Sequence, residues 1–436
     1  MKILHVTPHM GGGVGNVISK LVTHDTRNSH RVLLLEEPIR REHILSIIDN
    51  ICTFMNYDLE ILIEEIKYSD IVLVHWWHHP KTSEFLFNLP NIPMRLVIWS
   101  HISNLTVPAL NEGLLQEATK IIYTSEASLN SEAYRKVKDK LKIGVSVVSG
   151  CPGLEAFSDC KKEQQEIFTI GYLGVLDFSK MSGNFAEFCN SVPDEDVKFL
   201  IVGDGPDKEK LIKNLDSLSL LEKVIMTGYQ EDPKLMIAKM DILGYPLMGK
   251  HTATTENAVL EAMAMEVIPV LKNQLTEKYI VENGRTGYLV SNEKEYGEVI
   301  SFLKANPEIR IQIGKNAREY VLEKYTLERF KKTFYDACNT AMTQKKDVKN
   351  FQISLGELPY NWFVSGMGAD AHLFLESIIE IKKGNYIEVK RLLEQASPLV
   401  LGSNKGSVNQ YYNEFKSDKI LQQWYKLIHG DERYDV

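Results

Sequence analysis

One stretch, residues 251–270 (HTATTENAVLEAMAMEVIPV), gathers polar side chains at the start of an otherwise apolar helix. We predict a helix beginning near Thr255, with Thr255 as its N-cap and Glu256 in its first turn. Asn257 and Glu261 are four residues apart and share a face. Glu256 and Glu261 are separated by roughly 140° around the helix and are not placed to act as paired carboxylates. The free N–H groups of such a helix start suit a phosphate; the alternative is a capped surface helix.

Two further polar loops follow predicted strands. The segment HMGGGVGN places Gly11, Gly12, Gly13 and Gly15 at a helix start, where the backbone can approach a ligand closely. Its spacing misses the dinucleotide pattern GxGxxG, so we expect contact with a diphosphate or an acceptor; the alternative is a plain tight turn. In GYLGVLDFSKMSGN, Lys180 can neutralise a phosphate as a point charge, although a lone loop lysine is usually just solvated.

Aromatic and imidazole side chains gather at two other strand ends. The segment VHWWHHP contains His75, Trp76, Trp77 and His78, and VIWSHISN contains His101. Aromatic faces bind sugar rings and histidine titrates near neutrality, so we predict acceptor binding at the first segment. The alternatives are a partly buried aromatic corner and a structural histidine.

Composition excludes several classes of protein. The chain has 436 residues, so two or three domains are expected, and its formal net charge of -8 argues against a general nucleic-acid binder. Five scattered cysteines without a CxxC pair indicate free thiols in a reducing compartment, and no metal-ligand spacing occurs. The N-terminal segment has a buried-strand pattern rather than that of a signal peptide, and no apolar run is long enough to span a bilayer. We expect a cytoplasmic protein. The basic segment 132–142 leaves peripheral contact with the inner face of a membrane as an alternative to a solvated face.

Short apolar runs alternate with amphipathic segments along most of the chain. This alternation predicts parallel sheets covered by helices, in two doubly wound domains facing a cleft, with ligands beyond the carboxyl ends of the strands. The polar segment 161–166 suits a linker. We predict an N-terminal domain over residues 1–160, a second α/β domain over 161–345 and a helical extension over 346–436.

In this order the motifs resemble the retaining glycosyltransferases of family 4, which have the two-Rossmann GT-B fold. The resemblance covers roughly residues 1–340 and is strongest over 168–290. It rests on the glycine loop and on the following segments: SDIVLVH, VIWSH, IIYTSEAS, GYLGVLDFSK, FLIVGDGP, VIMTGY, MDILGYP, ENAVLEAMAMEVIPV and NGRTGYLV.

The resemblance implies a role for each matching residue. Glu261 matches the glutamate that holds the ribose, and His101 matches a histidine beside the donor sugar. The residues that would face the rest of the nucleotide sugar are Thr255, Asn257 and Ala258 for the diphosphate and sugar, Lys180, Gly12 and Gly13 for the phosphates, and Gly228 and Tyr229 for the base. Such enzymes need no metal or other cofactor, because basic side chains and helix dipoles stabilise the leaving group.

Two positions depart from the family pattern. The family's second glutamate, eight positions before Glu261, is Ala253 here, and an arginine frequent in the Lys180 loop is Val175. The interpretation is that Glu256 serves in place of the missing glutamate. The predicted catalytic residues are therefore His101, Lys180 and Glu256.

The predicted reaction is a retaining sugar transfer from a nucleotide diphosphate sugar, a UDP-sugar being favoured, to a hydroxyl of a glycan or lipid-linked acceptor. Two alternatives remain open at this point. One is a non-catalytic partner subunit, and the other is a sugar-nucleotide epimerase or hydrolase of the same fold. The role of residues 351–436, the sugar and the oligomeric state are not determined by the sequence.

Overall fold

The computed structural model describes residues 1–37, 42–53, 58–160, 162–163, 165–402 and 405–430. The chain forms two compact units: residues 1–150 with 331–436, and residues 151–330. The divisions therefore lie at 150/151 and 330/331, whereas the sequence analysis placed them at 160/161 and 345/346. Two residues of the predicted linker, Lys161 and Gln164, lie outside the described residues.

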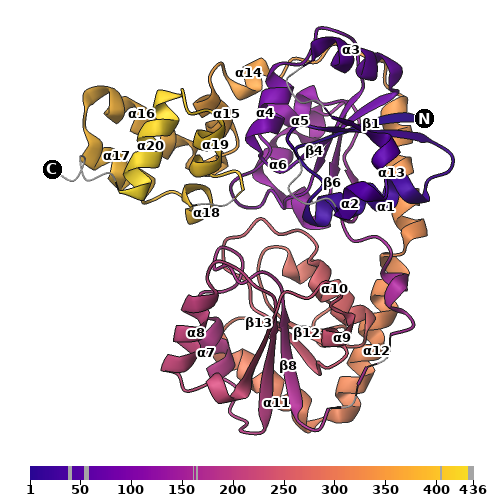
Figure 1. Ribbon diagram of the computed structural model, residues 1–436, viewed down its shortest axis with the longest axis vertical. Coiled ribbons are helices and arrows are strands. Elements are labelled where there is room, and N and C mark those ends of the chain that lie inside the picture. The colour runs from indigo at the N-terminus through magenta and orange to yellow at the C-terminus, as the bar shows by residue number, and fades with distance from the viewer. Residues whose placement is uncertain (38–41, 54–57, 161, 164, 403–404, 431–436) are drawn as a thin grey trace. The chain divides into compact units, whose positions relative to one another are not determined.

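The first unit is built on a parallel sheet with the strand order β3-β2-β1-β4-β5-β6-β7 (Figure 1). The strands are β1 (Lys2–Thr7), β2 (Ser29–Leu34), β3 (Ile51–Thr53), β4 (Ile71–Trp76), β5 (Leu96–Ser100), β6 (Lys120–Tyr123) and β7 (Ser146–Val147). Every residue of β4 and β5 is buried. Burial on both faces explains why these strands are continuous apolar runs rather than alternating ones.

Helices connect these strands. They are α1 (Gly12–His24), α2 (Glu42–Leu45), α3 (Leu59–Tyr68), α4 (Pro80–Phe87), α5 (Glu112–Glu117) and α6 (Glu132–Val137). Part of the charge of the basic segment 132–142 is neutralised, because Lys136 pairs with Glu132 and Glu112. None of the described helices is both long and apolar enough to cross a bilayer.

The second unit has a parallel sheet with the strand order β10-β9-β8-β11-β12-β13. Its strands are β8 (Phe168–Leu173), β9 (Val197–Val202), β10 (Val224–Gly228), β11 (Ile242–Tyr245), β12 (Ile268–Lys272) and β13 (Tyr288–Val290). Its helices are α7 (Phe185–Asn190), α8 (Lys208–Ser217), α9 (Lys234–Ile237), α10 (Asn257–Ala264), α11 (Glu293–Ala305) and α12 (Pro307–Lys324). The order of the inner strands reverses between β8 and β11, which is where doubly wound sheets bind ligands.

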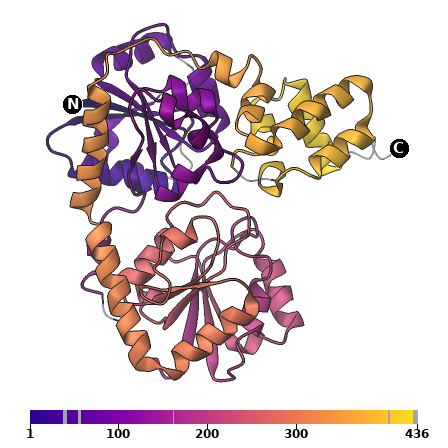
Figure 2. The same ribbon diagram turned by 180° about the vertical axis from the view of Figure 1, so that it is seen from behind.

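Helix α13 (Leu327–Met342) packs on the first unit from Lys331 onward (Figure 2). Phe334 stacks on Trp99 of the first sheet, with ring centroids 5.5 Å apart, and is fully buried. The C-terminal part of the chain thus returns to cover the sheet formed by its N-terminal part.

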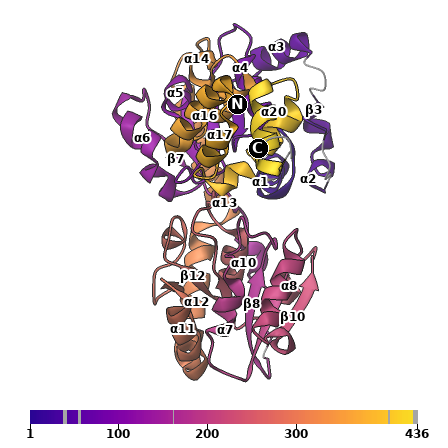
Figure 3. The ribbon, with the colours of Figure 1, turned by 90° about the vertical axis from the view of Figure 1, so that its left-hand side faces the viewer.

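The chain then forms the predicted helical extension. It contains α14 (Gln352–Leu355), α15 (Pro359–Ser365), α16 (Ala371–Lys383), α17 (Tyr386–Leu393), α18 (Pro398–Leu401), α19 (Val408–Glu414) and α20 (Lys419–His429). Helices α16, α17 and α20 lie side by side (Figures 1 and 3). Trp362, Phe363 and Trp424 belong to the same hydrophobic cluster as Phe85 of α4 and Ile98 of β5. The extension therefore shares the core of the first unit instead of forming a separate domain.

Candidate active site

The helix that follows the polar stretch of the second unit, α10, begins two residues later than predicted. Glu256, not Thr255, is the N-cap of α10, and its backbone is extended with φ −82° and ψ 107°. The Glu256 carbonyl accepts the N–H groups of Val259 and Leu260, and its side chain makes no capping bond. The predicted Thr255 cap is therefore wrong, because the extended Glu256 delays the first helical residue to Asn257. The Thr255 hydroxyl is instead buried without a hydrogen-bond partner among the described residues.

Because it makes no capping hydrogen bond, the Glu256 carboxylate is available for other contacts, and it forms the centre of a buried polar cluster. Its Oε2 lies 2.8 Å from Lys180 Nζ, and it accepts the hydroxyl hydrogen of Tyr245 at 2.7 Å. Tyr172 stacks on the Tyr245 ring with centroids 5.2 Å apart. Lys180 follows β8 and Tyr245 ends β11, so the cluster stands at the carboxyl ends of two neighbouring strands.

Main-chain hydrogen bonds hold the two loops of this cluster together. Ser182 N–H donates to Pro246 O at 3.0 Å, and Met248 N–H donates to Lys180 O at 2.8 Å. Residues 181 and 247 form an antiparallel bridge between them. Lys180 therefore differs from a freely moving loop lysine: the backbone on both sides of it is fixed against the loop that leads to α10, and its ammonium pairs with Glu256, while a third of its side chain is exposed.

The two charges of this pair stabilise each other. Burial by itself raises the pKa of Glu256, but the nearby Lys180 ammonium outweighs burial and lowers that pKa. Burial by itself lowers the pKa of Lys180, and the Glu256 carboxylate outweighs it and raises that pKa. Both groups are consequently charged at neutral pH.

A second buried pair fixes the loop before α10, and the sequence analysis missed it. His251 Nε2 lies 2.9 Å from Glu277 Oε1, and Gln274 donates to the same oxygen at 2.9 Å. Because Ala253 N–H donates to His251 Nδ1, this imidazole carries its hydrogen on Nε2, facing the carboxylate. No local signal could reveal the pair, since its members are 26 residues apart in the chain.

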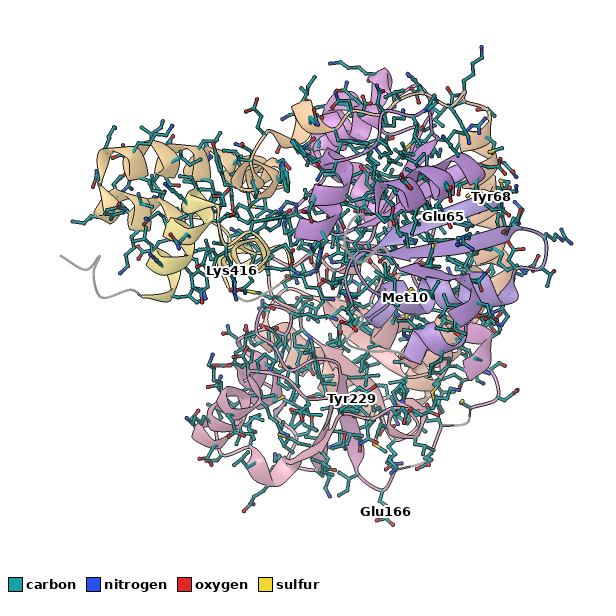
Figure 4. The ribbon with its side chains drawn as sticks, turned by 45° about the horizontal axis from the view of Figure 1, so that its top comes forward. Met10, Glu65, Tyr68, Glu166, Tyr229 and Lys416 are labelled. Carbon is teal, nitrogen blue, oxygen red and sulfur yellow. The ribbon has the colours of Figure 1, made fainter. Side chains whose placement is uncertain are left out.

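The other predicted nucleotide-site residues of this unit lie near the same sheet edge. Asn257, Ala258 and Glu261 are partly exposed on the first turns of α10. Gly228 ends β10 with φ +70°, and Tyr229, labelled in Figure 4, has 68% of its surface exposed. An exposed aromatic ring at a strand end is available for stacking.

The glycine loop of the first unit begins α1. Gly12 has φ +61°, and an added Cβ at Gly12 or Gly13 would meet no atom within 4 Å. A Cβ at Gly15 would lie 1.9 Å from the carbonyl oxygen of Met10, a residue labelled in Figure 4. Gly15 is therefore required for packing, while Gly12 and Gly13 leave open space beside the first amides of the helix.

The predicted acceptor residues are buried in this arrangement. His75 and Trp76 are 0% and 1% exposed, and Trp76 belongs to the core of the first unit. Trp77 is nearly buried, and His78 packs between Tyr411 and Phe363 of the helical extension. These side chains offer no ring face to a sugar, so the acceptor role assigned to them from sequence does not fit. The helical extension covers His78, whereas His75 lies between His5 and His101 of the sheet.

His101 is partly exposed just after β5. Its Nε2 lies 2.8 Å from Nδ1 of His75, and its ring stacks on Trp99. Burial lowers the pKa of His101 to about 3, so the imidazole is neutral at physiological pH. A neutral imidazole can donate one hydrogen bond and accept another.

Residues 156–320 match the model of the family described as glycosyl transferases group 1. They include β8 to β13, Lys180, the Glu256 cluster and α10. This part of the chain is similar to the group 1 glycosyltransferases, and the match covers less than half of the 436 residues. The match covers the second unit, where the resemblance predicted from sequence was strongest.

Two curated relatives match this chain over a stretch about as long as the family match. Alpha-monoglucosyldiacylglycerol synthase of Acholeplasma laidlawii is 26% identical over 170 residues, covering 39% of this chain and 41% of that protein. N-acetyl-alpha-D-glucosaminyl L-malate synthase of Bacillus anthracis is 27% identical over 156 residues, covering 34% and 40%. The chain thus spans about two fifths of the length of these relatives.

The solved structures show the same fold over more of the chain. HepE of Anabaena in complex with UDP superposes with a TM-score of 0.64 at 16% identity, covering 78% of this chain and all of that one. The same protein in complex with UDP-glucose gives a TM-score of 0.62 at 17% identity. At this level of identity the likeness concerns the fold alone.

Proposed function

We propose that this protein transfers a sugar from a nucleoside diphosphate sugar, with retention of the anomeric configuration, to a hydroxyl of a glycan or lipid-linked saccharide. The observation that carries the proposal is the cluster of Lys180, Glu256 and Tyr245 at the carboxyl edge of the second sheet. It lies beside the N-terminus of α10, within the part of the chain that matches the group 1 family.

The cluster suits a leaving diphosphate for electrostatic reasons. Lys180 supplies a fixed positive charge, and the first amides of α10 at Asn257 and Ala258 have no acceptor within the helix. Glu261 is assigned to the ribose hydroxyls, and Gly228 with Tyr229 to the base. Fixed donors of this kind stabilise charge that develops in the transition state, which is the property that a metal ion would otherwise supply. Metal independence stays a prediction.

Glu256 fills the role that Ala253 cannot. Its carboxylate has no capping duty, is fixed between Lys180 and Tyr245, and remains ionised. In the proposed reaction it positions Lys180 and accepts a hydrogen bond from a hydroxyl of the donor sugar. Val175, at the position of the family arginine, is 42% exposed and brings no charge, so Lys180 carries more of the phosphate neutralisation.

The proposed step is balanced within the two substrates. The acceptor oxygen forms a bond to the anomeric carbon while the bond from that carbon to the diphosphate oxygen breaks. The electron pair leaves with the diphosphate, and a donor phosphate oxygen takes the acceptor proton on the same face. The protein positions the substrates and stabilises the leaving group.

The test is a thermal-shift panel followed by donor consumption. UDP, GDP, ADP, CMP and dTDP are compared on the wild type and on Glu261→Ala; a nucleotide at about 100 times its Kd stabilises by roughly 2.7 kcal/mol. We expect UDP to stabilise the wild type and not the variant. No shift with any nucleotide would contradict the proposal and favour the non-catalytic alternative.

Turnover is then measured with Lys180→Gln and a matched variant, Lys315→Gln. Lys315 is exposed on α12, so both changes remove one lysine charge from the same unit. Lys180→Gln should lose about ten- to a thousandfold in rate, whereas Lys315→Gln should keep the wild-type rate. Donor consumption that is independent of any acceptor would instead indicate an epimerase or hydrolase.

A further inference from the structure

Four imidazoles form a hydrogen-bonded row across the sheet of the first unit. His30 is in β2, His5 in β1 and His75 in β4, and His101 follows β5. His30 Nδ1 lies 2.9 Å from His5 Nε2, His5 Nδ1 lies 3.0 Å from His75 Nε2, and His75 Nδ1 lies 2.8 Å from His101 Nε2. Every link therefore joins the Nδ1 of one ring to the Nε2 of the next. The row runs from the beginning of β2 to the carboxyl end of β5.

The row ends on a carboxylate. Asp25 Oδ2 lies 3.0 Å from His30 Nε2, and it also accepts from Asn28 Nδ2 at 2.8 Å and from the hydroxyl of Tyr335. Asp25 Oδ1 accepts the backbone N–H groups of Arg27 and Asn28. Burial by itself raises the pKa of Asp25, but the hydrogen bonds from His30 and its neighbours outweigh burial and lower it. Asp25 is thus an anion that only accepts hydrogen bonds.

This anion determines which nitrogen of each ring carries hydrogen. Facing Asp25, His30 must carry its hydrogen on Nε2, which leaves Nδ1 as an acceptor. His5 must then donate from Nε2, and the same logic applies to His75 and His101 in turn. Burial holds the pKa of His5 and His75 well below the ordinary value. It also lowers the pKa of His101, and it lowers the pKa of His30 despite the opposing effect of Asp25, so each of the four rings has a single hydrogen.

We propose that Asp25, through this row, holds His101 as the Nε2–H tautomer, so that its unprotonated Nδ1 is offered as a hydrogen-bond acceptor at the carboxyl edge of the sheet. Within the described part of the chain, His101 is hydrogen-bonded to His75 through Nε2, and its Nδ1 has no hydrogen-bond partner. The group it fits is a hydroxyl. That this hydroxyl belongs to a sugar rests on the proposed transferase function. Asp25 is a positioning residue, acting through His30, His5 and His75.

The opposite arrangement is disfavoured by the same contacts. If every ring carried hydrogen on Nδ1, the Nε2 lone pair of His30 would face the carboxylate. The Tyr335 hydroxyl, 3.3 Å from that nitrogen, would have to turn to it, and Asp25 would lose two donors. A buried charged group that loses its partners is costly, so the row keeps one direction.

The substitution Asp25→Asn should reverse the row. Two backbone N–H groups hold the Oδ1 position, so the amide oxygen takes that position and the NH2 group faces His30. His30 must then accept on Nε2, and His101 ends with hydrogen on Nδ1. Tyr335→Phe is the matched control, because it removes a neighbouring donor to Asp25 but leaves the Asp25–His30 contact.

The measurement is long-range proton–nitrogen NMR on protein labelled with ¹⁵N-histidine, with the His101 signals assigned by their loss in His101→Gln. We expect the Nε2–H form of His101 in the wild type and in Tyr335→Phe, and the Nδ1–H form in Asp25→Asn. An imidazolium or an Nδ1–H form in the wild type would overturn the proposal, and so would an unchanged tautomer in a folded Asp25→Asn.

Kinetics separate this inference from the proposed function. If the protein is a transferase, Asp25→Asn should lower kcat/KM about tenfold at unchanged UDP affinity, because a donor replaces an acceptor at His101. An unchanged kcat/KM together with a reversed tautomer would refute the role of His101 Nδ1 in binding the sugar. The tautomer can be read without any substrate, so failure to bind nucleotides would refute the transferase proposal alone.

Discussion

The first unit should lose stability steeply in mild acid, because it buries neutral imidazoles. His5, His75 and His78 are at most 1% exposed, and burial lowers the pKa of each, to about 3 for His78. Below the ordinary histidine pKa of about 6.5, the unfolded chain binds protons that the folded chain does not. The free energy of unfolding therefore falls as pH falls.

The magnitude follows from linkage. For each imidazole that titrates with an ordinary pKa only when unfolded, the loss between about pH 7 and about pH 5 is about 2 kcal/mol, so three give about 6 kcal/mol. This is comparable to the whole stability of many domains. His30 and His79 are also buried with a lowered pKa, so the three imidazoles counted here give a lower bound. His101 is left out because part of its surface is exposed.

Tryptophan fluorescence reports on this unit selectively. The five tryptophans of the chain, Trp76, Trp77, Trp99, Trp362 and Trp424, all lie in residues 1–150 and 331–436. Guanidinium unfolding followed by this signal at about pH 7, 6 and 5 gives the free energy directly.

Two variants test the cause of the acid sensitivity. His78→Asn removes one buried imidazole, and asparagine tolerates the φ of +60° at this position, so the loss should shrink by about 2 kcal/mol. His372→Asn changes an exposed histidine of α16 and should leave the pH dependence as it is. A wild-type loss below about 2 kcal/mol over this pH range would refute the neutral, buried state of these rings.

Three further predictions concern single contacts. Lys180→Met should cost about 1–3 kcal/mol, because it leaves Glu256 buried without its cation while a third of the Lys180 side chain is exposed to screening solvent. The double variant Lys180→Met/Glu256→Gln should recover most of that lost stability, as measured by urea denaturation followed by circular dichroism. Losses that simply add in the double variant would show that the pair is not coupled. Because the pKa of Glu256 is lowered, its stabilisation is present above the ordinary carboxyl range and is lost as pH falls through the lowered value. The Tm gap between wild type and Glu256→Gln should therefore close in acid, and a constant gap would contradict the pKa shift. Gly15→Ala should destabilise by about 1–3 kcal/mol, since its Cβ would meet Met10 O at 1.9 Å, while Gly13→Ala has open space; equal Tm values for the two variants would contradict this packing.

The sequence predicted the elements well because buried parallel strands carry a strong local signal. The predicted alternation of strands and helices is present over residues 1–150 and 168–290. The strand β3 (Ile51–Thr53) was missed, because three residues at a sheet edge give no recognisable pattern. The role of the helical extension was also missed, since the faces of its helices identify a buried side but not the surface that covers it.

The site residues also divide into those with a local sequence signal and those that depend on tertiary contacts. Roles for Lys180 and Glu261 could be predicted because each stands at a fixed place in a local motif, and these roles stay predictions. The pairing of Lys180 with Glu256 could not, because it depends on two loops held together by main-chain bonds. The acceptor role given to Trp76 failed for a related reason: an aromatic cluster has the same sequence pattern whether it is exposed or covered.

By itself, the sequence determined the alternation of strands and helices, the fold class and the motif order of the family. Only the tertiary structure decided which distant side chains meet. The histidine row shows why. The registers pair His30 with Ile3, Leu73 with His5, and Trp99 with His75, so each ring stands two residues beyond its neighbour's partner. A step of two keeps all the rings on one face of the sheet, but the strand order that brings them together is set by crossover connections, which leave no mark in the spacing of the histidines themselves.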